Sequence, residues 1–266
     1  MAQRTQKTTR RQKLLGNHQK CWIWGKNVVL ETLRVGRWPI LELRLADRLA
    51  RPKLAEARQL AESRDVPVIV DTADELARRC GSSEHQGYLA KMPPFPYDDR
   101  ETLLRRKISS PLYLVLDSIQ DPYNFGAVLR CAEVFGVDAV FVAERGQAEV
   151  TSLVARTSAG AVNHLRIAKA ERLVDVVKRL RGAKVSVVAA TQHGSTDIGD
   201  FDFRAPTAIV IGNEGEGITA PLLEQCDATV RIPQQGSVGS LNAAVAAGIV
   251  LYEAARQRRR VGANPP

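Results

Sequence analysis

The sequence predicts an α/β protein that is built from two units. Apolar strand-like runs alternate with helical patterns along most of the chain, and a proline-rich stretch at residues 92–100 interrupts this alternation. Hydrophobic residues make up 44% of the 266 residues and charged residues 25%, which is typical of globular proteins. A chain of this length accommodates two modest domains.

The first unit is expected over residues 21–92, where short strands and helices follow one another. Helical patterns are expected at residues 26–36, at 52–63 and from about 72 to Arg79, and strand patterns at residues 40–45, 67–70 and 87–91. The first helix is expected to end at Gly36. Either Asp71 or Thr72 has a side chain suited to cap the third helix.

The second unit is expected over residues 111–258, after a linker at 93–110. Its strand-like runs lie at residues 112–116, 139–143, 185–190, 207–211 and 229–232, and its helical patterns lie near 125–136, 171–181 and 240–257. Strands that alternate with helices predict a mostly parallel sheet covered on both faces. Binding sites in such sheets lie at the carboxyl ends of the strands, where three notable loops of this sequence fall.

Positive charge is concentrated at the two ends of the chain. Residues 1–20 contain six basic side chains and no acidic one, residues 251–266 carry a net charge of +3, and the segment between them is formally neutral. Basic tails of this kind favour a polyanion such as nucleic acid as the partner, with a solubilising, disordered terminus as the alternative. Residues 259–266 are likewise expected to form a tail.

Composition also argues against several classes of protein. No apolar run approaches the roughly 20 residues of a membrane helix, and the polar, basic start does not resemble a secretory signal. We therefore expect a cytoplasmic protein with no membrane partner. None of the four cysteines forms a C-x-x-C pair, so no metal site is expected.

Each of the three loops allows a purely structural interpretation. Asn124 lies near a helix start and is a candidate N-cap, whereas Arg130 is a candidate solvated surface residue. Residues 212–217, G-N-E-G-E-G, do not match a dinucleotide or phosphate-binding glycine motif and are compatible with a tight turn that caps the next helix. Ser240 is a candidate N-cap and Asn242 a candidate local backbone partner.

Taken together, the three loops form an ordered set of motifs. D-P-x-N-x-G-A-x-x-R spans residues 121–130, I-G-N-E-G-x-G spans 211–217, and I-P-x-x-G-S-V-x-S-L-N-A-A-V-A spans 232–246. The set resembles the signature of the SpoU (TrmH-like) RNA 2′-O-ribose methyltransferases of the SPOUT superfamily. Residues 22–92, which contain His85-Gln86-Gly87 near their end, resemble the family's small L30e-like substrate-binding domain. The pair of domains is most similar to the bacterial type that methylates a guanosine of 23S rRNA.

The resemblance implies a fold, a cofactor and an assembly. The C-terminal SPOUT domain would contain a trefoil knot, bind S-adenosylmethionine and form a homodimer in which the small-residue C-terminal helix takes part. Gly212, Ile232 and Leu241 would contact the cofactor, with Thr191 and Asn213 as further candidates. His85 would belong to a domain signature with a possible RNA contact and would not be a catalytic base.

The resemblance also implies the catalytic residues. Arg130 is expected to position the RNA phosphate and the ribose 2′-oxygen, because an arginine side chain stays protonated in proteins. Asn124, Glu214, Ser240 and Asn242 would orient Arg130 and the substrate, with a buried Glu214 forming an ion pair with Arg130. No metal is required, since the methyl donor is already activated.

The expected reaction is methylation of a ribose 2′-hydroxyl in structured RNA, with a guanosine of large-subunit rRNA as the favoured target. The alternatives are a tRNA 2′-O-methyltransferase and a non-catalytic RNA-binding protein of the same fold. A nucleotide-dependent oxidoreductase would need a glycine fingerprint after the strand at residues 112–116, and that loop contains none.

Overall fold

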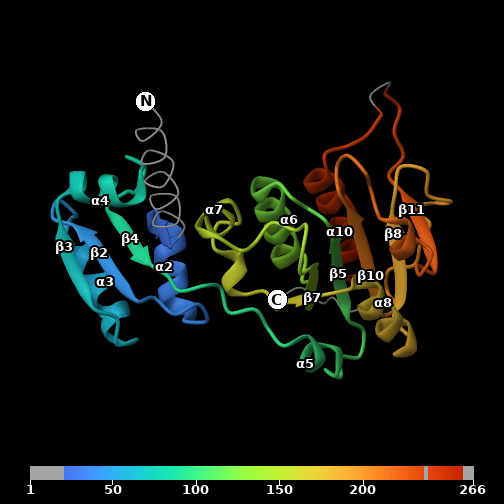
Figure 1. Ribbon diagram of the computed structural model, residues 1–266, viewed down its shortest axis with the longest axis horizontal. Helices are drawn as coiled ribbons and strands as arrows, with labels where there is room; N and C mark the ends of the chain where they lie inside the picture. Colours follow the sequence, from blue (N-terminus) through green and yellow to red (C-terminus); the bar gives the residue numbers. More distant parts are fainter. Residues whose placement is uncertain (1–20, 237–238, 260–266) are drawn as a thin grey trace, which may run out of the picture. The chain divides into compact units, whose positions relative to one another are not determined.

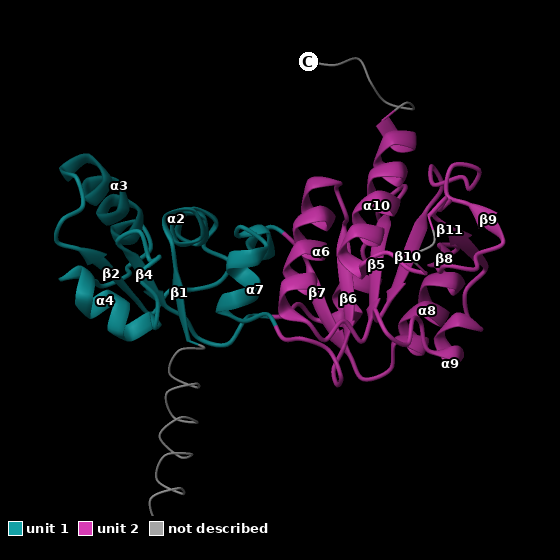
Figure 2. Ribbon diagram, turned by 90° about the horizontal axis from the view of Figure 1, so that it is seen from above, with its two compact units in different colours: residues 1–96, 150–164 teal, residues 97–149, 165–266 magenta. Residues whose placement is uncertain are grey.

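The computed structural model describes residues 21–236 and 239–259 of the chain (Figure 1). The basic segment at residues 1–20 and most of the C-terminal tail lie outside the described residues. The chain divides into two compact units (Figure 2). The first contains the residues up to Pro96 together with residues 150–164, and the second contains residues 97–149 and those from Leu165 onwards.

The first unit is a four-stranded mixed sheet with helices. The strands have the order β1 (Trp22–Trp24), β4 (Tyr88–Lys91), β2 (Glu42–Ala46), β3 (Val68–Asp71). β4 is antiparallel to both β1 and β2, and β2 is parallel to β3. The main helices are α2 (Lys26–Val35), α3 (Arg51–Glu62) and α4 (Ala73–Cys80). The three-residue β1 was absent from the sequence prediction, because so short a run has no measurable periodicity.

Local capping rules account for two helix ends in this unit. Gly36 ends α2 in the left-handed conformation with φ 69°, and its N–H donates to the Thr32 carbonyl at 2.9 Å. Thr72, rather than Asp71, caps α4, because its hydroxyl accepts from the Glu75 N–H at 3.2 Å. The structure thus decides between the two caps that the sequence left open.

Residues 150–164 belong to the first unit although they lie between two strands of the second. This segment forms α7 (Ser152–Thr157) and a 3₁₀ turn at Ala161–Asn163. The Asn163 amide donates to the Thr32 hydroxyl at 3.0 Å, and both residues are buried. His164 Nε2 lies 2.8 Å from a carboxylate oxygen of Glu31. No local pattern separates this segment from its neighbours, because its partners are more than 100 residues away.

The second unit is a seven-stranded sheet in which every pairing is parallel. Its strand order is β7-β6-β5-β10-β8-β11-β9. The strands are β5 (Leu112–Asp117), β6 (Ala139–Ala143), β7 (Ile167–Ala170), β8 (Ser186–Ala190), β9 (Thr196–Asp197), β10 (Thr207–Gly212) and β11 (Ala228–Arg231). The predicted mostly parallel α/β sheet is therefore confirmed, with β7 and β9 as strands that the sequence did not indicate.

Helices cover this sheet. α5 (Arg100–Leu104), α8 (Leu173–Gly182) and α9 (Ala220–Leu223) contribute to a core cluster with alternate residues of the strands, such as Val115 and Val210. α6 (Pro122–Val134) packs on α10 (Ala243–Arg259), which also contacts β10. Because β5 and β10 pair from Leu112–Thr207 to Asp117–Gly212, the loops that follow them leave the same edge of the sheet.

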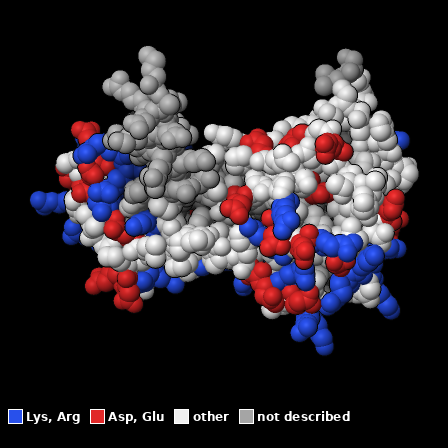
Figure 3. All heavy atoms as spheres, in the orientation of Figure 1, with Lys and Arg blue, Asp and Glu red and all other residues white. Residues whose placement is uncertain are grey.

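The surface agrees with the neutral charge of the central segment. Acidic and basic side chains are interspersed on the face shown in Figure 3. Within residues 21–236 and 239–259, no helix has the length and apolar character to cross a membrane. The trefoil knot implied by the resemblance stays a prediction.

Candidate active site

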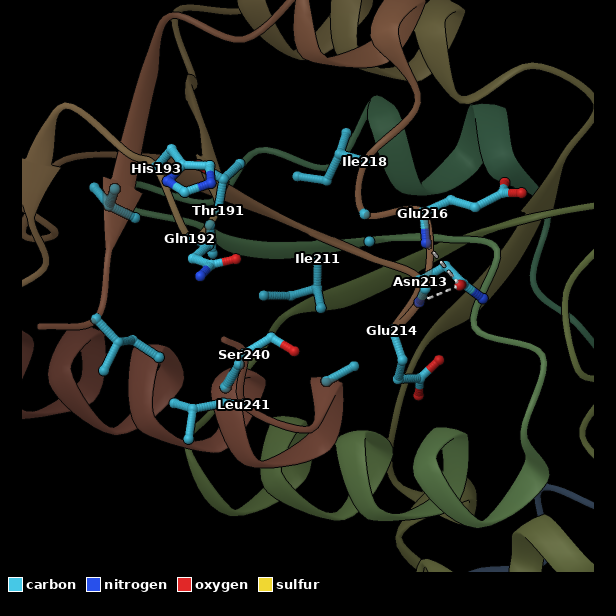
Figure 4. Close-up of a pocket in the computed structure, with 18 of the residues that line it drawn as sticks. Thr191, Gln192, His193, Ile211, Asn213, Glu214, Glu216, Ile218, Ser240 and Leu241 are labelled. Carbon is cyan, nitrogen blue, oxygen red and sulfur yellow. Dashed lines mark hydrogen bonds between the residues drawn. The ribbon is translucent and has the colours of Figure 1, made fainter. Parts of the chain in front are cut away.

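A pocket of about 390 Å³ lies at the carboxyl edge of the second sheet (Figure 4). Its walls come from the segments that follow β8, β10 and β11 and from the start of α10. Backbone groups and apolar side chains such as Ile211, Ile218 and Leu241 line most of it. A pocket of this size and lining suits a small organic ligand.

The turn at residues 212–217, where β10 ends, folds tightly because three of its residues are glycines. A Cβ atom at Gly212 would lie 2.2 Å from the Gly217 carbonyl carbon, so no side chain fits there. Asn213 and Gly217 exchange backbone hydrogen bonds of 3.0 and 2.9 Å, and Gly217 has φ 72°. The tight turn anticipated from the glycines is present, but it does not cap the next helix, because α9 begins only at Ala220.

Two polar side chains tie this loop to the loop after β5. The Asn213 side-chain oxygen accepts from the Gly215 N–H at 2.7 Å, while its amide nitrogen donates to the Ser118 carbonyl at 2.8 Å. The buried Asp117 carboxylate accepts from the N–H and the hydroxyl of Thr219, each at 2.8 Å. These bonds hold the loop after β10 against the end of β5 and the residue that follows it, and so fix the shape of the pocket wall.

All five residues proposed from the sequence as cofactor contacts line this pocket, and their placement leaves their binding role a prediction. They are Thr191, Gly212, Asn213, Ile232 and Leu241. The pocket also contains four polar side chains that the sequence reasoning did not select: Gln192, His193, Glu216 and Gln234. Gln192 and His193 could have been selected from the sequence, because they follow closely after a strand of a parallel sheet.

Three of the five proposed catalytic residues form a chain of hydrogen bonds. The Asn242 amide donates to the Asn124 side-chain oxygen at 3.0 Å, and the Asn124 amide donates to the Glu214 carboxylate. They come from the start of α10, from α6 and from the loop after β10, and the partners of Asn124 lie about 90 residues or more along the sequence. In Figure 4 the Glu214 side chain points towards α6.

The residues that cap α6 and α10 are not the candidates, Asn124 and Ser240, that the sequence suggested. Asp121, not Asn124, caps α6 by accepting from the Tyr123 N–H at 3.0 Å. Asn242, not Ser240, caps α10, since its side-chain oxygen accepts from the Ala244 and Val245 N–H groups at 2.9 and 3.2 Å. The expectation that Ser240 is an N-cap was wrong, because the helix begins at Ala243 rather than near residue 240.

Arg130 and Ser240 stand apart from this hydrogen-bonded chain. Ser240 lines the pocket, whereas Arg130 is exposed on α6. The expected ion pair between a buried Glu214 and Arg130 was wrong: Glu214 is exposed, and within the described ranges it forms no ion pair with Arg130. Asn124 and Arg130 are six residues apart, about 1.7 turns, so they project from different sides of the helix.

The titratable side chains give no indication of a metal centre. In the part of the chain that the structure describes, no three His, Cys, Asp or Glu side chains are grouped as metal ligands.

Comparison with known proteins places both units. The family model of the SpoU rRNA Methylase family matches residues 111–252, and the model for RNA 2′-O ribose methyltransferase substrate binding matches residues 22–98. An uncharacterised tRNA/rRNA methyltransferase of Mycolicibacterium gilvum is 38% identical over 252 residues, which cover 92% of this chain and 80% of the relative.

Two solved structures resemble the whole fold. The SpoU methyltransferase AviRb from Streptomyces viridochromogenes, in complex with AdoMet, has a TM-score of 0.75 and 30% identity and covers 91% of each chain. An AdoMet-bound rRNA methyltransferase from Sinorhizobium meliloti has a TM-score of 0.78 and 26% identity and covers 91% of this chain and 88% of its own. The chain described here belongs to the SpoU methylase family of RNA methyltransferases.

Proposed function

We propose that this protein transfers a methyl group from S-adenosylmethionine to a ribose 2′-hydroxyl of structured RNA. The observation that carries the proposal is the pocket at the carboxyl edge of the second sheet, with the Asn242–Asn124–Glu214 chain beside it. Family membership and two similar AdoMet-bound structures support the choice of cofactor.

The pocket fits S-adenosylmethionine in size and lining. A Cβ does not fit at Gly212, and without a side chain the backbone itself lies at the pocket wall. Its N–H and C=O groups can bind a planar base or a ribose. Apolar contacts come from Ile211, Ile232 and Leu241. The negative charge of Glu214, which also lines the pocket, favours the positively charged sulfonium of the cofactor. Gly212, Asn213, Thr191, Ile232 and Leu241 are therefore proposed to hold the cofactor.

The remaining residues are proposed to align the RNA. Bound S-adenosylmethionine supplies a methyl group that is already activated for attack by an oxygen nucleophile. The protein's task is then chiefly to position the ribose oxygen in line with that methyl group. The Asn242–Asn124–Glu214 chain fixes the orientation of the Glu214 carboxylate, because each amide is held at both of its ends. Ser240, at the pocket wall, adds a hydroxyl that can contact the substrate.

Arg130 is proposed to bind an RNA phosphate and to stabilise negative charge that develops on the 2′-oxygen. Its exposed guanidinium has no hydrogen bond or ion pair to any of the described residues, so its donors are free for a ligand. Arginine suits phosphate because its planar fork donates two parallel hydrogen bonds.

We further propose a guanosine of large-subunit rRNA as the target. The similar structure from Sinorhizobium meliloti, named an rRNA methyltransferase, covers both units of this chain. The relative from Mycolicibacterium gilvum is named for both tRNA and rRNA, so tRNA is the alternative to be tested.

A homodimer through the C-terminal domain is also proposed. Large apolar side chains are exposed on the packed pair α6 and α10: Tyr123 and Val134 on the first helix, and Val245 and Tyr252 on the second, each at least half exposed. Most alanines of α10 are buried within the chain, and Ala246 is the partly exposed one beside Val245. A second copy of the chain would remove this apolar surface from water.

The first experiment measures transfer of labelled methyl groups from S-adenosylmethionine to unmodified total RNA by the wild type, Arg130→Ala and Arg130→Lys. The wild type is expected to label large-subunit rRNA as a 2′-O-methyl nucleotide. Both variants are expected to lose on the order of a hundredfold in rate, the lower end of the loss seen when one stabilising donor is removed.

The outcomes separate the alternatives. Near-normal transfer by Arg130→Lys would contradict a need for the planar guanidinium. Label in tRNA would retain the chemistry and change the target. RNA binding without any cofactor binding would instead indicate a non-catalytic RNA-binding protein.

A further inference from the structure

A second cavity, of about 550 Å³, lies entirely within the first unit and is distinct from the pocket described above. Three separate segments line it: the end of β1 with the start of α2, the turn before β4, and α7 with the residue two positions after it. The residues that carry the argument are Trp24, Asn27, Glu84, Gln86, Arg156 and Ala159. We propose that this cavity binds an unpaired nucleotide of the substrate RNA, an inference that rests on the proposed function.

The floor of the cavity is a cation over an aromatic ring. The Arg156 guanidinium carbon lies 4.1 Å from the centre of the Trp24 ring. Among the described residues, no hydrogen bond or ion pair engages the Arg156 guanidinium, so its N–H groups are free to bind a ligand. RNA-binding proteins hold unstacked bases on aromatic rings and on arginine planes.

The His85-Gln86-Gly87 turn supplies a rigid wall. His85 is buried, and its Nδ1 accepts from the Gly87 N–H at 3.0 Å. A Cβ at Gly87 would lie 2.8 Å from a methyl carbon of Leu49, and Gly87 has φ 84°, so glycine is required. This turn holds Gln86 at φ 54°, where its side-chain oxygen accepts from the Lys26 N–H at 2.8 Å.

The fixed oxygen of Gln86 leaves the amide nitrogen of the same side chain as a donor. The amide of Asn27 and the carboxylate of Glu84 line the same cavity, and within the described chain Glu84 forms no ion pair. The cavity thus combines donors with an acceptor, which suits the mixed donor and acceptor edges of a nucleobase. A simple anion would not need the carboxylate.

Long-range contacts hold the third wall in place. Asn163 bonds to Thr32 at 3.0 Å, and an Arg37 guanidinium nitrogen donates to the Val162 carbonyl at 3.2 Å. These bonds anchor the segment that contains Arg156 on α2, which begins at the cavity, and on the residue two positions after that helix. The proposed RNA contact therefore combines two parts of the sequence. Trp24, Asn27, Glu84 and Gln86 belong to the segment matched by the substrate-binding model, whereas Arg156 and Ala159 belong to the segment matched by the methylase model.

The test uses the full-length protein and a single-stranded RNA of about 12 nucleotides and random sequence, with a duplex of equal length for comparison. Arg156→Ala is expected to weaken binding of the single strand about tenfold, in line with the loss of one stacking contact. The matched control is Arg58→Ala, which removes the same charge from an exposed position on α3 and is expected to change affinity less than about twofold. Arg156→Lys, which keeps the charge but not the plane, is expected to remain weak.

Equal losses in Arg156→Ala and Arg58→Ala, or full affinity in Arg156→Lys, would overturn the proposal. A second measurement uses the unchanged protein: ultraviolet crosslinking of the same RNA is expected at residues 22–28, 84–86 or 156–159. Crosslinks found only elsewhere would also overturn it.

Failure of this proposal and failure of the proposed function give different results. Wild-type methyl transfer together with normal RNA binding by Arg156→Ala would refute the cavity and keep the enzyme. Loss of RNA binding in Arg156→Ala, with no methyl transfer to any RNA by the wild type, would keep the cavity and refute the enzyme.

Discussion

At the scale of single residues, several side-chain amides perform two tasks at once, one with each end. The side-chain oxygen of Asn242 caps α10, and its amide nitrogen donates to Asn124. Asn213 likewise closes its own loop with one end and binds the Ser118 carbonyl with the other. An amide suits such positions because it presents a donor and an acceptor at fixed separation.

The two tasks of Asn242 can be separated by substitution. Asn242→Ala removes both and is expected to lower the free energy of unfolding by about 1 kcal/mol through the lost cap. Asn242→Asp keeps the capping oxygen and loses the donor, so stability should stay within about 0.5 kcal/mol of the wild type. Both variants are expected to slow methyl transfer on the order of tenfold, because Asn124 and Glu214 lose their orientation.

Urea unfolding and initial methyl-transfer rates measure the two effects. A wild-type rate for Asn242→Asp would refute the role of the hydrogen-bonded chain in orienting Glu214.

His85 predicts a pH dependence of stability. Burial lowers the pKa of His85 below its ordinary value of 6.5, and a hydrogen bond to the Ala73 backbone acts in the opposite direction. The unfolded chain therefore binds a proton more readily than the folded one, so this contribution to stability is present above pH 6.5 and is lost as the pH falls below that value.

The His85→Asn substitution keeps an oxygen acceptor for the Gly87 N–H and removes the titrating group. We expect it to reduce the difference in the free energy of unfolding of the first unit between about pH 7.5 and about pH 5.5, measured by urea unfolding. An unchanged difference would show that other groups cause the pH dependence.

At the scale of elements, the residues that cap α6 and α10 also determine where residues of the candidate site lie. Asp121 and Asn242 cap α6 and α10, and each cap lies close in sequence to a residue of the candidate site. Each cap fixes the first turn of its helix. The first turn of α6 carries Asn124, and the first turn of α10 follows Leu241. Sequence periodicity located both helices but placed the start of α10 too early, because Ser240 and Asn242 are both good capping residues.

The exposed apolar surface of α6 and α10 predicts dimerisation. Val245→Asp places a charge on this surface and is expected to shift sedimentation from a dimer towards a monomer, since an unpaired charge is costly inside an interface. Leu41→Asp is the matched control, because Leu41 is also about half exposed but lies in the first unit. A monomeric wild type, or a dimeric Val245→Asp, would contradict the proposed interface.

At the scale of the whole molecule, the two proposed sites lie in two compact units with separate cores. One contains the pocket proposed for the cofactor and the other the cavity proposed for an RNA nucleotide. Separate cores allow the two units to unfold in separate transitions, so a ligand of one unit need not stabilise the other.

This arrangement predicts a selective thermal shift. S-adenosylmethionine at about 100 times its dissociation constant stabilises the state that binds it by about 2.7 kcal/mol. That corresponds to a rise of roughly 5–10 °C in the Tm of a unit of this size. Calorimetry should show the rise in the transition of the second unit only. A rise confined to the first unit would place the cofactor elsewhere.

The sequence by itself determined what depends on local patterns. Alternating strands and helices predicted the parallel sheet, and two of the three ordered motifs, at residues 211–217 and 232–246, identified segments that line the pocket. These predictions succeeded because periodicity, turn residues and motif order are properties of neighbouring residues.

Only the tertiary structure decided which distant residues meet. It joined Asn124, Glu214 and Asn242, left Arg130 exposed and without the expected partner, and packed residues 150–164 on the first unit. The physical reason is that such contacts depend on the order and register of strands and on packing between segments far apart in the sequence. Local propensities do not contain that information, and burial and hydrogen bonding in the folded chain supply it.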